Sequence, residues 1–159
     1  MNRTFFCILC LLMPCSLMAQ TPLPSKPNSK VKAMLESSGR ASDEHSGGAA
    51  TVVNMQRKTM KVPELKTNDQ LLCASLLTLV AMNAEKSCSV KDLKAVLAQC
   101  KYTGSTYQGL VSCDTKNPAA VLYVWINDTN QNNTLISTKY SEVGCGHLAD
   151  NWVCILGAP

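Results

Sequence analysis

The hydrophobic and polar positions divide the chain into an apolar start, a polar stretch and a longer patterned remainder. Residues 5–12 form an unbroken apolar run, whereas residues 20–50 are rich in Pro, Ser and Gly. The polar stretch cannot bury enough surface to offset its ordering entropy, so it predicts a flexible leader or a cleaved pro-segment. Residues 51–159 show the periodicity of folded elements and suffice for one hydrophobic core. We therefore expect a single domain over residues 51–159.

Two helices are predicted in the first half of this domain. Residues 52–60 form a modestly amphipathic stretch. The string Thr67-Asn68-Asp69-Gln70 reads as a capping box, in which the Thr hydroxyl and the Gln amide satisfy each other's backbone donors. It opens a helix from Leu71 to about Asn83, and the almost continuous apolar surface of that helix predicts a central position.

Two further helices are predicted in the second half. The string Ser89-Val90-Lys91-Asp92 repeats the capping pattern, and apolar residues recur at helical spacing from Leu93 to Cys100. Asn117 followed by Pro118 is the strongest helix start in the chain, because Asn is a favoured N-cap and Pro suits the first helical position. Trp125 lies on the apolar face of this last helix.

The end of the chain has the pattern of a β-hairpin. Residues 142–147 and 152–156 are short apolar-biased runs separated by Leu148-Ala149-Asp150-Asn151. A turn centred on Ala149-Asp150 would place Cys145 opposite Cys154 in a narrow pair, with the Cα atoms about 4.5 Å apart. A turn centred on Asp150-Asn151 would put the two cysteines out of register. Ala-Asp is not a typical two-residue turn sequence, so both registers stay open.

The first nineteen residues have the features of a secretory signal peptide. Arg3 supplies the positive charge, the apolar run follows, and Ala19 offers a small residue for cleavage. The run is shorter than the about 20 apolar residues that a membrane span needs. We expect a secreted, extracellular protein with no transmembrane segment and no lipid anchor.

Removal of that segment leaves an even number of cysteines. Nine become six in a chain destined for an oxidising compartment, which predicts three disulfides. Six cysteines allow 15 connectivities, and the sequence does not choose among them. Structural zinc is disfavoured because the mature chain has no Cys-x-x-Cys pair. The six are Cys73, Cys88, Cys100, Cys113, Cys145 and Cys154.

Charge argues against two classes of function. The full chain has 15 Lys plus Arg against 11 Asp plus Glu, and the basic residues are scattered. Nucleic-acid binding would require a concentrated basic stripe. A lytic toxin or antimicrobial protein would require a strongly cationic amphipathic surface, so we keep a small disulfide-rich toxin only as an alternative.

Several local strings, taken in chain order, resemble one family of secreted proteins. They are Val52-Val53-Asn54-Met55-Gln56-Arg57, Pro63-Glu64-Leu65, Asn68-Asp69-Gln70-Leu71, Ala120–Trp125, Tyr140–Gly146 and Trp152-Val153-Cys154. Together they span roughly 100 residues and resemble the CAP superfamily, the cysteine-rich secretory, antigen-five and pathogenesis-related proteins with their SCP-like domain. The resemblance implies an α+β fold, an α-β-α sandwich in which helices cover both sides of a small antiparallel sheet.

The resemblance also implies a cavity with two histidines and two acids, which binds a divalent metal in some members. In this chain Gln131 stands at one histidine position, Leu110 stands at one acid position, and Asp128 matches the other acid. The first histidine has no counterpart near Cys100. Asp128 and a neutral amide cannot hold zinc tightly, so we expect no metal and no cofactor.

These observations favour a secreted, non-enzymatic CAP-like domain that recognises a lipid, a peptide or a host surface protein. No catalytic residue is assigned. The alternative is a hydrolase of the same family that uses His147 as its base, so Asp128, Gln131 and His147 are the candidate cavity residues. Residues 127–134 read as a polar loop with two glycosylation sequons, at Asn127 and Asn132, which a eukaryotic source could use.

Overall fold

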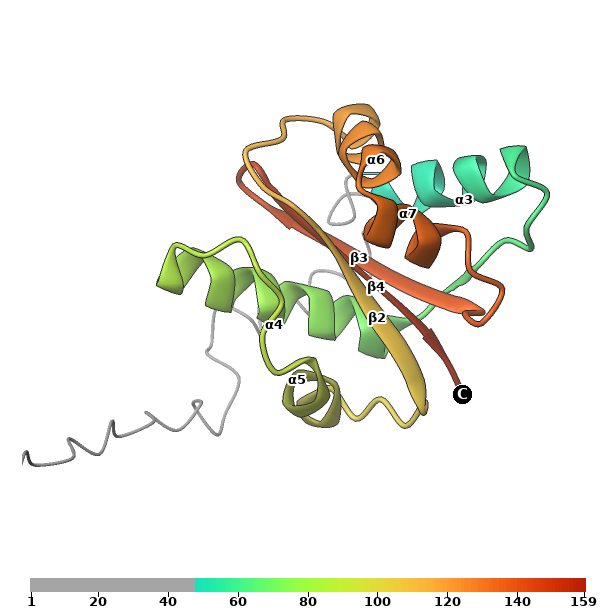
Figure 1. The fold of residues 1–159 in the computed structure, drawn as a ribbon. Helices are drawn as coiled ribbons and strands as arrows, with labels where there is room; N and C mark the ends of the chain where they lie inside the picture. The colour runs from blue at the N-terminus through green and yellow to red at the C-terminus, as the bar shows by residue number, and fades with distance from the viewer. Residues whose placement is uncertain (1–47) are drawn as a thin grey trace, which may run out of the picture.

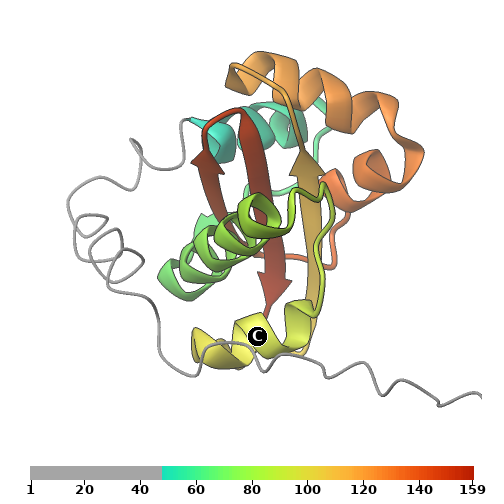
Figure 2. The same cartoon turned by 90° about the vertical axis from the view of Figure 1, so that its left-hand side faces the viewer.

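The computed structural model describes residues 48–159, which form three layers (Figures 1 and 2). The predicted signal peptide, residues 1–19, and nearly all of the predicted leader lie outside the described residues. Two helices cover one face of a four-stranded sheet, and three helices cover the other. The elements are α3 (Ala49–Thr59), β1 (Lys66–Thr67), α4 (Asp69–Glu85), α5 (Leu93–Gln99), β2 (Thr106–Ser112), α6 (Pro118–Asn127), α7 (Thr129–Leu135), β3 (Glu142–Leu148) and β4 (Asn151–Ala158).

The sheet has the order β1-β3-β4-β2 and is mixed rather than purely antiparallel. The pairs β3–β4 and β2–β4 are antiparallel as predicted, but β1 runs parallel to β3. The parallel pair follows from the route of the chain, because β1 leads directly into α4, which begins over β3. Two bonds fix it, from Lys66 N–H to the Ser141 carbonyl at 2.9 Å and from Asn68 N–H to the Val143 carbonyl at 3.0 Å.

Both faces of the sheet are buried, so the core has two halves. One half lies between the sheet and α3, α6 and α7, and its largest side chain, Trp125, is completely buried. The other half lies under α4 and α5. Residues 152–157 of β4 are buried without interruption, which is why that strand is continuously apolar instead of alternating. The predicted central position of the second helix is confirmed.

The helix starts show where local signals sufficed and where they did not. Asn117 caps α6 by accepting a bond from Ala120 N–H at 2.9 Å, as predicted. The cap of α4 is Asn68 rather than Thr67, since Thr67 belongs to β1. The predicted Ser89 cap of α5 is wrong: the helix begins after Asp92, whose φ of 44° is left-handed. The first helix begins at Ala49, inside the predicted leader.

The hairpin has the register that a turn at Ala149-Asp150 predicts. Cys145 lies opposite Cys154 with a Cα–Cα distance of 4.0 Å, and the two form a disulfide. Ala149 takes the positive φ, 54°, that two-residue hairpin turns require at this position. The predicted number of bridges is confirmed, and the other two join Cys73 to Cys100 and Cys88 to Cys113.

Candidate functional site

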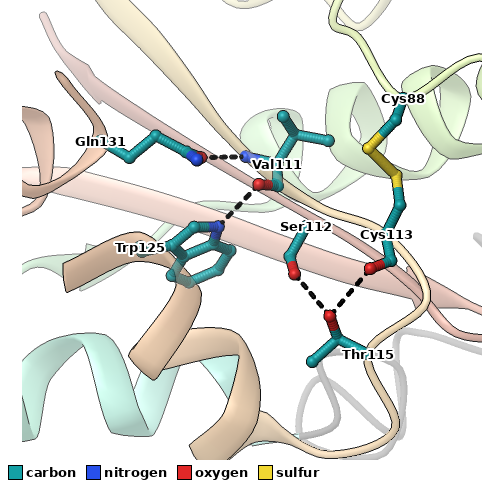
Figure 3. Close-up of a disulfide and its surroundings, with 7 residues drawn as sticks. All are labelled: Cys88, Val111, Ser112, Cys113, Thr115, Trp125 and Gln131. Atoms are coloured by element: carbon teal, nitrogen blue, oxygen red, sulfur yellow. Dashed lines mark hydrogen bonds between the residues drawn. A yellow bond between two sulfur atoms is a disulfide. The ribbon is translucent and has the colours of Figure 1, made fainter. Parts of the chain in front are cut away.

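The residue at the expected histidine position, Gln131, lies against the outer edge of β2 (Figure 3). Its side-chain oxygen accepts a 2.8 Å bond from Val111 N–H, and Trp125 Nε1–H donates a 3.0 Å bond to the Val111 carbonyl. In an antiparallel pair, alternate residues direct both backbone groups to the same side. The backbone N–H and C=O of Val111 therefore point away from β4. The side chains of Gln131 and Trp125 bond to them as a neighbouring strand would.

The expected acid, Asp128, has a local structural role. Its carboxylate accepts 2.9 Å bonds from the backbone N–H groups of Asn130 and Gln131, which makes it the N-cap of α7. The prediction of a polar loop over residues 127–134 is therefore wrong, because most of that segment is helical. Asn127 ends α6 and Asn132 lies within α7, and their use as glycosylation sites stays a prediction.

His147 lies apart from the other two candidate residues. It sits near the end of β3, where its ring stacks on Trp152 of β4 with the ring centroids 4.6 Å apart. Two strand spacings of about 4.8 Å separate β3 from β2, so His147 is roughly 10 Å from the edge where Gln131 bonds. Trp152, on the strand between them, pairs with His147 on one side and with Ser112, the neighbour of Val111, on the other. The structure thus brings Asp128 and Gln131 together but leaves His147 across the sheet.

Leu110 stands where the resemblance places the second acid, and it is completely buried. It belongs to the same core cluster as Trp125 and Trp152. Within residues 48–159, no group of three His, Cys, Asp or Glu side chains could hold a metal ion. The residues present at the expected cavity therefore do not fit a divalent metal.

A buried hydroxyl pair, which the sequence did not indicate, follows the end of β2 (Figure 3). Ser112 Oγ and Thr115 Oγ1 lie 2.7 Å apart, and the Thr115 hydroxyl also lies 2.9 Å from the Cys113 carbonyl. Trp152 Nε1–H donates to the Thr115 carbonyl at 2.5 Å. These bonds anchor the β2–α6 loop to the hairpin. Within the described chain, neither hydroxyl bonds to a basic side chain, so the pair has a structural role.

Tyr102 and Glu142 form a separate polar pair beside a surface depression of about 190 Å³. The Tyr102 hydroxyl donates a 3.0 Å bond to Glu142 Oε2. Burial first, and then the bond to Glu142 and its charge, raise the pKa of Tyr102 to about 12. The tyrosine ring fills the space beside Gly104 and Gly157, so this pair belongs to the packing of the fold.

Tyr102 should make the domain sensitive to alkali. Its folded-state pKa is raised above the usual value of 10, so its contribution to stability is complete below pH 10 and is lost as pH rises toward 12. In an absorbance titration of the folded protein's four tyrosines, we expect a late step near pH 12. Tyr102→Phe should remove it. Complete titration of the wild-type tyrosines near pH 10 would contradict this assignment.

Comparison with known proteins gives the fold. No protein-family profile and no curated protein sequence matches the chain. A cysteine-rich secretory protein from Staphylococcus aureus superposes with a TM-score of 0.62 at 20% identity, over 86% of this chain and 40% of that one. An extracellular SCP-domain protein from Bacillus anthracis has a TM-score of 0.66 at 15% identity, over 70% of this chain and 39% of that one. An outer surface protein from Borrelia burgdorferi has a TM-score of 0.63 at 14% identity, over 68% of this chain and 87% of that one.

These similarities confirm the predicted architecture. At such identities they show the fold, which is the CAP or SCP-like α-β-α sandwich. The chain spans about two fifths of the first two proteins. No helix in the described part of the chain combines the length and the apolar character that a membrane crossing requires.

Proposed function

We propose that this chain is an extracellular CAP-like domain that acts by binding, and that its ligand is an extended peptide segment of another protein. Three disulfides support an oxidising location, where such bonds persist. The similar structures include proteins described as secretory, extracellular and outer-surface. These descriptions agree with the predicted export of the chain.

The uses of the candidate cavity residues argue against catalysis. Gln131 covers the edge of β2, Asp128 begins α7, and His147 stacks on Trp152. A hydrolase needs a base within hydrogen-bond reach of its nucleophile. The buried hydroxyls of Ser112 and Thr115 bond to each other, and the three candidate groups contribute to the fold.

The outer edge of β2 carries the proposal of a peptide ligand. The backbone N–H and C=O groups of Val111 point away from β4, so by alternation those of Tyr107 and Gly109 point outward too. Within the described chain, the outward N–H and C=O groups of these two residues have no hydrogen-bond partner, unlike those of Val111. Gln108 between them is exposed. An added strand would satisfy these groups by β-augmentation, with Trp125 and Gln131 closing the edge at one end.

The test uses a display library of random linear peptides and one matched pair of variants. Gly109→Pro removes the outward N–H without disturbing the bonds to β4, and Gly109→Ala keeps that N–H. Loss of one hydrogen bond of about 1.4 kcal/mol predicts roughly tenfold weaker peptide binding for Gly109→Pro. Gly109→Ala should bind like wild type. Selected peptides that bind Gly109→Pro equally well would overturn the proposal.

An activity assay tests the non-enzymatic part of the proposal. We expect no turnover of nitrophenyl esters or fluorogenic peptides by the wild-type protein. His147→Phe keeps a ring against Trp152 while removing the base, so it separates chemistry from packing. Turnover by wild type that His147→Phe abolishes would assign a hydrolase instead.

A further inference from the structure

We infer that a second site, separate from the β2 edge, lies at the C-terminal end of α4 and binds a small zwitterion of the α-amino acid type. A depression of about 280 Å³ is formed there by three segments. They are the end of α4 with Asn83 and Lys86, the end of β2 with Asp114, and the start of β4 with Asn151. This volume lies just below the roughly 300 Å³ at which small-molecule pockets begin, so it suits a ligand of amino-acid size.

Covalent and hydrogen bonds hold the walls of this depression in place. The Cys88–Cys113 disulfide lines it and joins the segment after α4 to the end of β2 (Figure 3). Thr115 N–H donates a 2.8 Å bond to the Asp150 carbonyl, which ties the β2–α6 loop to the hairpin turn. The site is therefore preorganised, and a ligand would not have to order these segments.

Positive backbone φ values occur at the depression and in the hairpin turn beside it. Lys86, Asp114 and Ala149 have left-handed φ values of 50°, 55° and 54°. This conformation costs an L-residue about 1–2 kcal/mol, and such residues cluster at ligand sites. Of the six non-glycine residues with positive φ in the described chain, Lys86 and Asp114 line the depression, and Ala149 belongs to the hairpin turn.

The charges select the class of ligand. The Lys86 ammonium and the Asp114 carboxylate both line the depression and are exposed, and neither forms an ion pair within residues 48–159. A simple anion would be repelled by Asp114 and a simple cation by Lys86, whereas a zwitterion satisfies both. The C-terminal end of a helix carries partial negative charge, so the end of α4 favours an ammonium group as well. The amides of Asn83 and Asn151 offer additional donors and acceptors.

The experiment is a titration of the folded domain with alanine, glutamine and serine, followed by amide NMR shifts at Lys86, Asp114 and Asn151. We expect saturable shifts, with the methyl ester and the N-acetyl derivative of the same amino acid at least tenfold weaker. Lys86→Gln and Asp114→Asn should each weaken binding at least tenfold. Lys139→Gln and Asp69→Asn, which change exposed charges elsewhere, should have no effect.

Two results would overturn this inference. Amino acids that leave the three amides unmoved would exclude the site, and equal binding of the singly charged derivatives would exclude zwitterion recognition. The Gly109→Pro variant should bind the amino acid normally. Failure of the proposed peptide site and failure of this site are therefore distinguishable.

Discussion

Replacement of Gly144 by alanine should destabilise the domain by about 3 kcal/mol or more, which is the upper range for overpacking. Gly144 lies on β3 directly under the first turn of α4. A Cβ atom there would overlap the backbone of Leu71 and Leu72, and would lie 2.7 Å from Leu71 Cβ. Backbone atoms cannot move aside as a side chain can, so α4 would have to lift from the sheet. Urea unfolding followed by circular dichroism measures the loss.

Gly146 provides the matched control for this prediction. It lies two residues further along β3 and faces the same helix, but a Cβ there would meet only the methyl ends of Leu76 and Leu79, at 3.0 and 3.2 Å. Those side chains can adjust, so Gly146→Ala should change the unfolding free energy by about 1 kcal/mol at most. Equal stability of the two variants would show that α4 does not lie as close to β3 as described.

The close approach at Gly144 explains part of what the sequence could predict. The string Tyr140–Gly146 was recognised by its glycines, and the structure gives the reason for one of them. The hairpin itself was also accessible, although two turns stayed open until the structure placed Cys145 opposite Cys154. These features depend on residues close together in the chain, so a local pattern was enough.

The elements that sequence reasoning missed are stabilised by distant partners. β2 was not predicted, since the side chains that complete its outer edge at Val111 come from α6 and α7. α7 has only one buried residue, Leu135, so it lacks an apolar stripe. A signal for α7 was present: Asp128 followed three residues later by Gln131 is a capping pattern. The assignment of residues 127–134 to a loop gave that signal no weight.

The same distinction holds for the candidate site. The residue substitutions at positions 110 and 131 could be seen in the sequence, but their consequences could not. Gln131 was expected to line a cavity beside His147, and it bonds to Val111 instead, with Trp152 between the two candidates. The pairing of Cys88 with Cys113, which lines the proposed amino-acid site, also depends on a contact between segments 25 residues apart.

The second large effect should come from Arg57, which is completely buried. Its Nε–H donates to the Pro63 carbonyl at 2.8 Å, and Nη1–H groups donate to the carbonyls of Leu135 and Ser137 at 2.7 and 2.9 Å. The guanidinium thereby joins α3 to the loops after α3 and α7. Burial lowers the pKa of Arg57, and within the described chain its Nη2 has no hydrogen-bond partner.

Arg57→Met should lower the unfolding free energy by about 3–5 kcal/mol, measured by urea unfolding. Removal of a buried charge recovers some desolvation energy, but the buried Leu135 carbonyl and the partly buried carbonyls of Pro63 and Ser137 lose their donor, and that cost dominates. The unfolding free energy of Arg57→Lys should fall between those of wild type and Arg57→Met, because one ammonium cannot span carbonyls on separate loops. Lys58→Met, at the exposed neighbouring position, should stay within about 0.5 kcal/mol of wild type. If Arg57→Met is no more destabilising than Lys58→Met, the guanidinium does not hold these segments together.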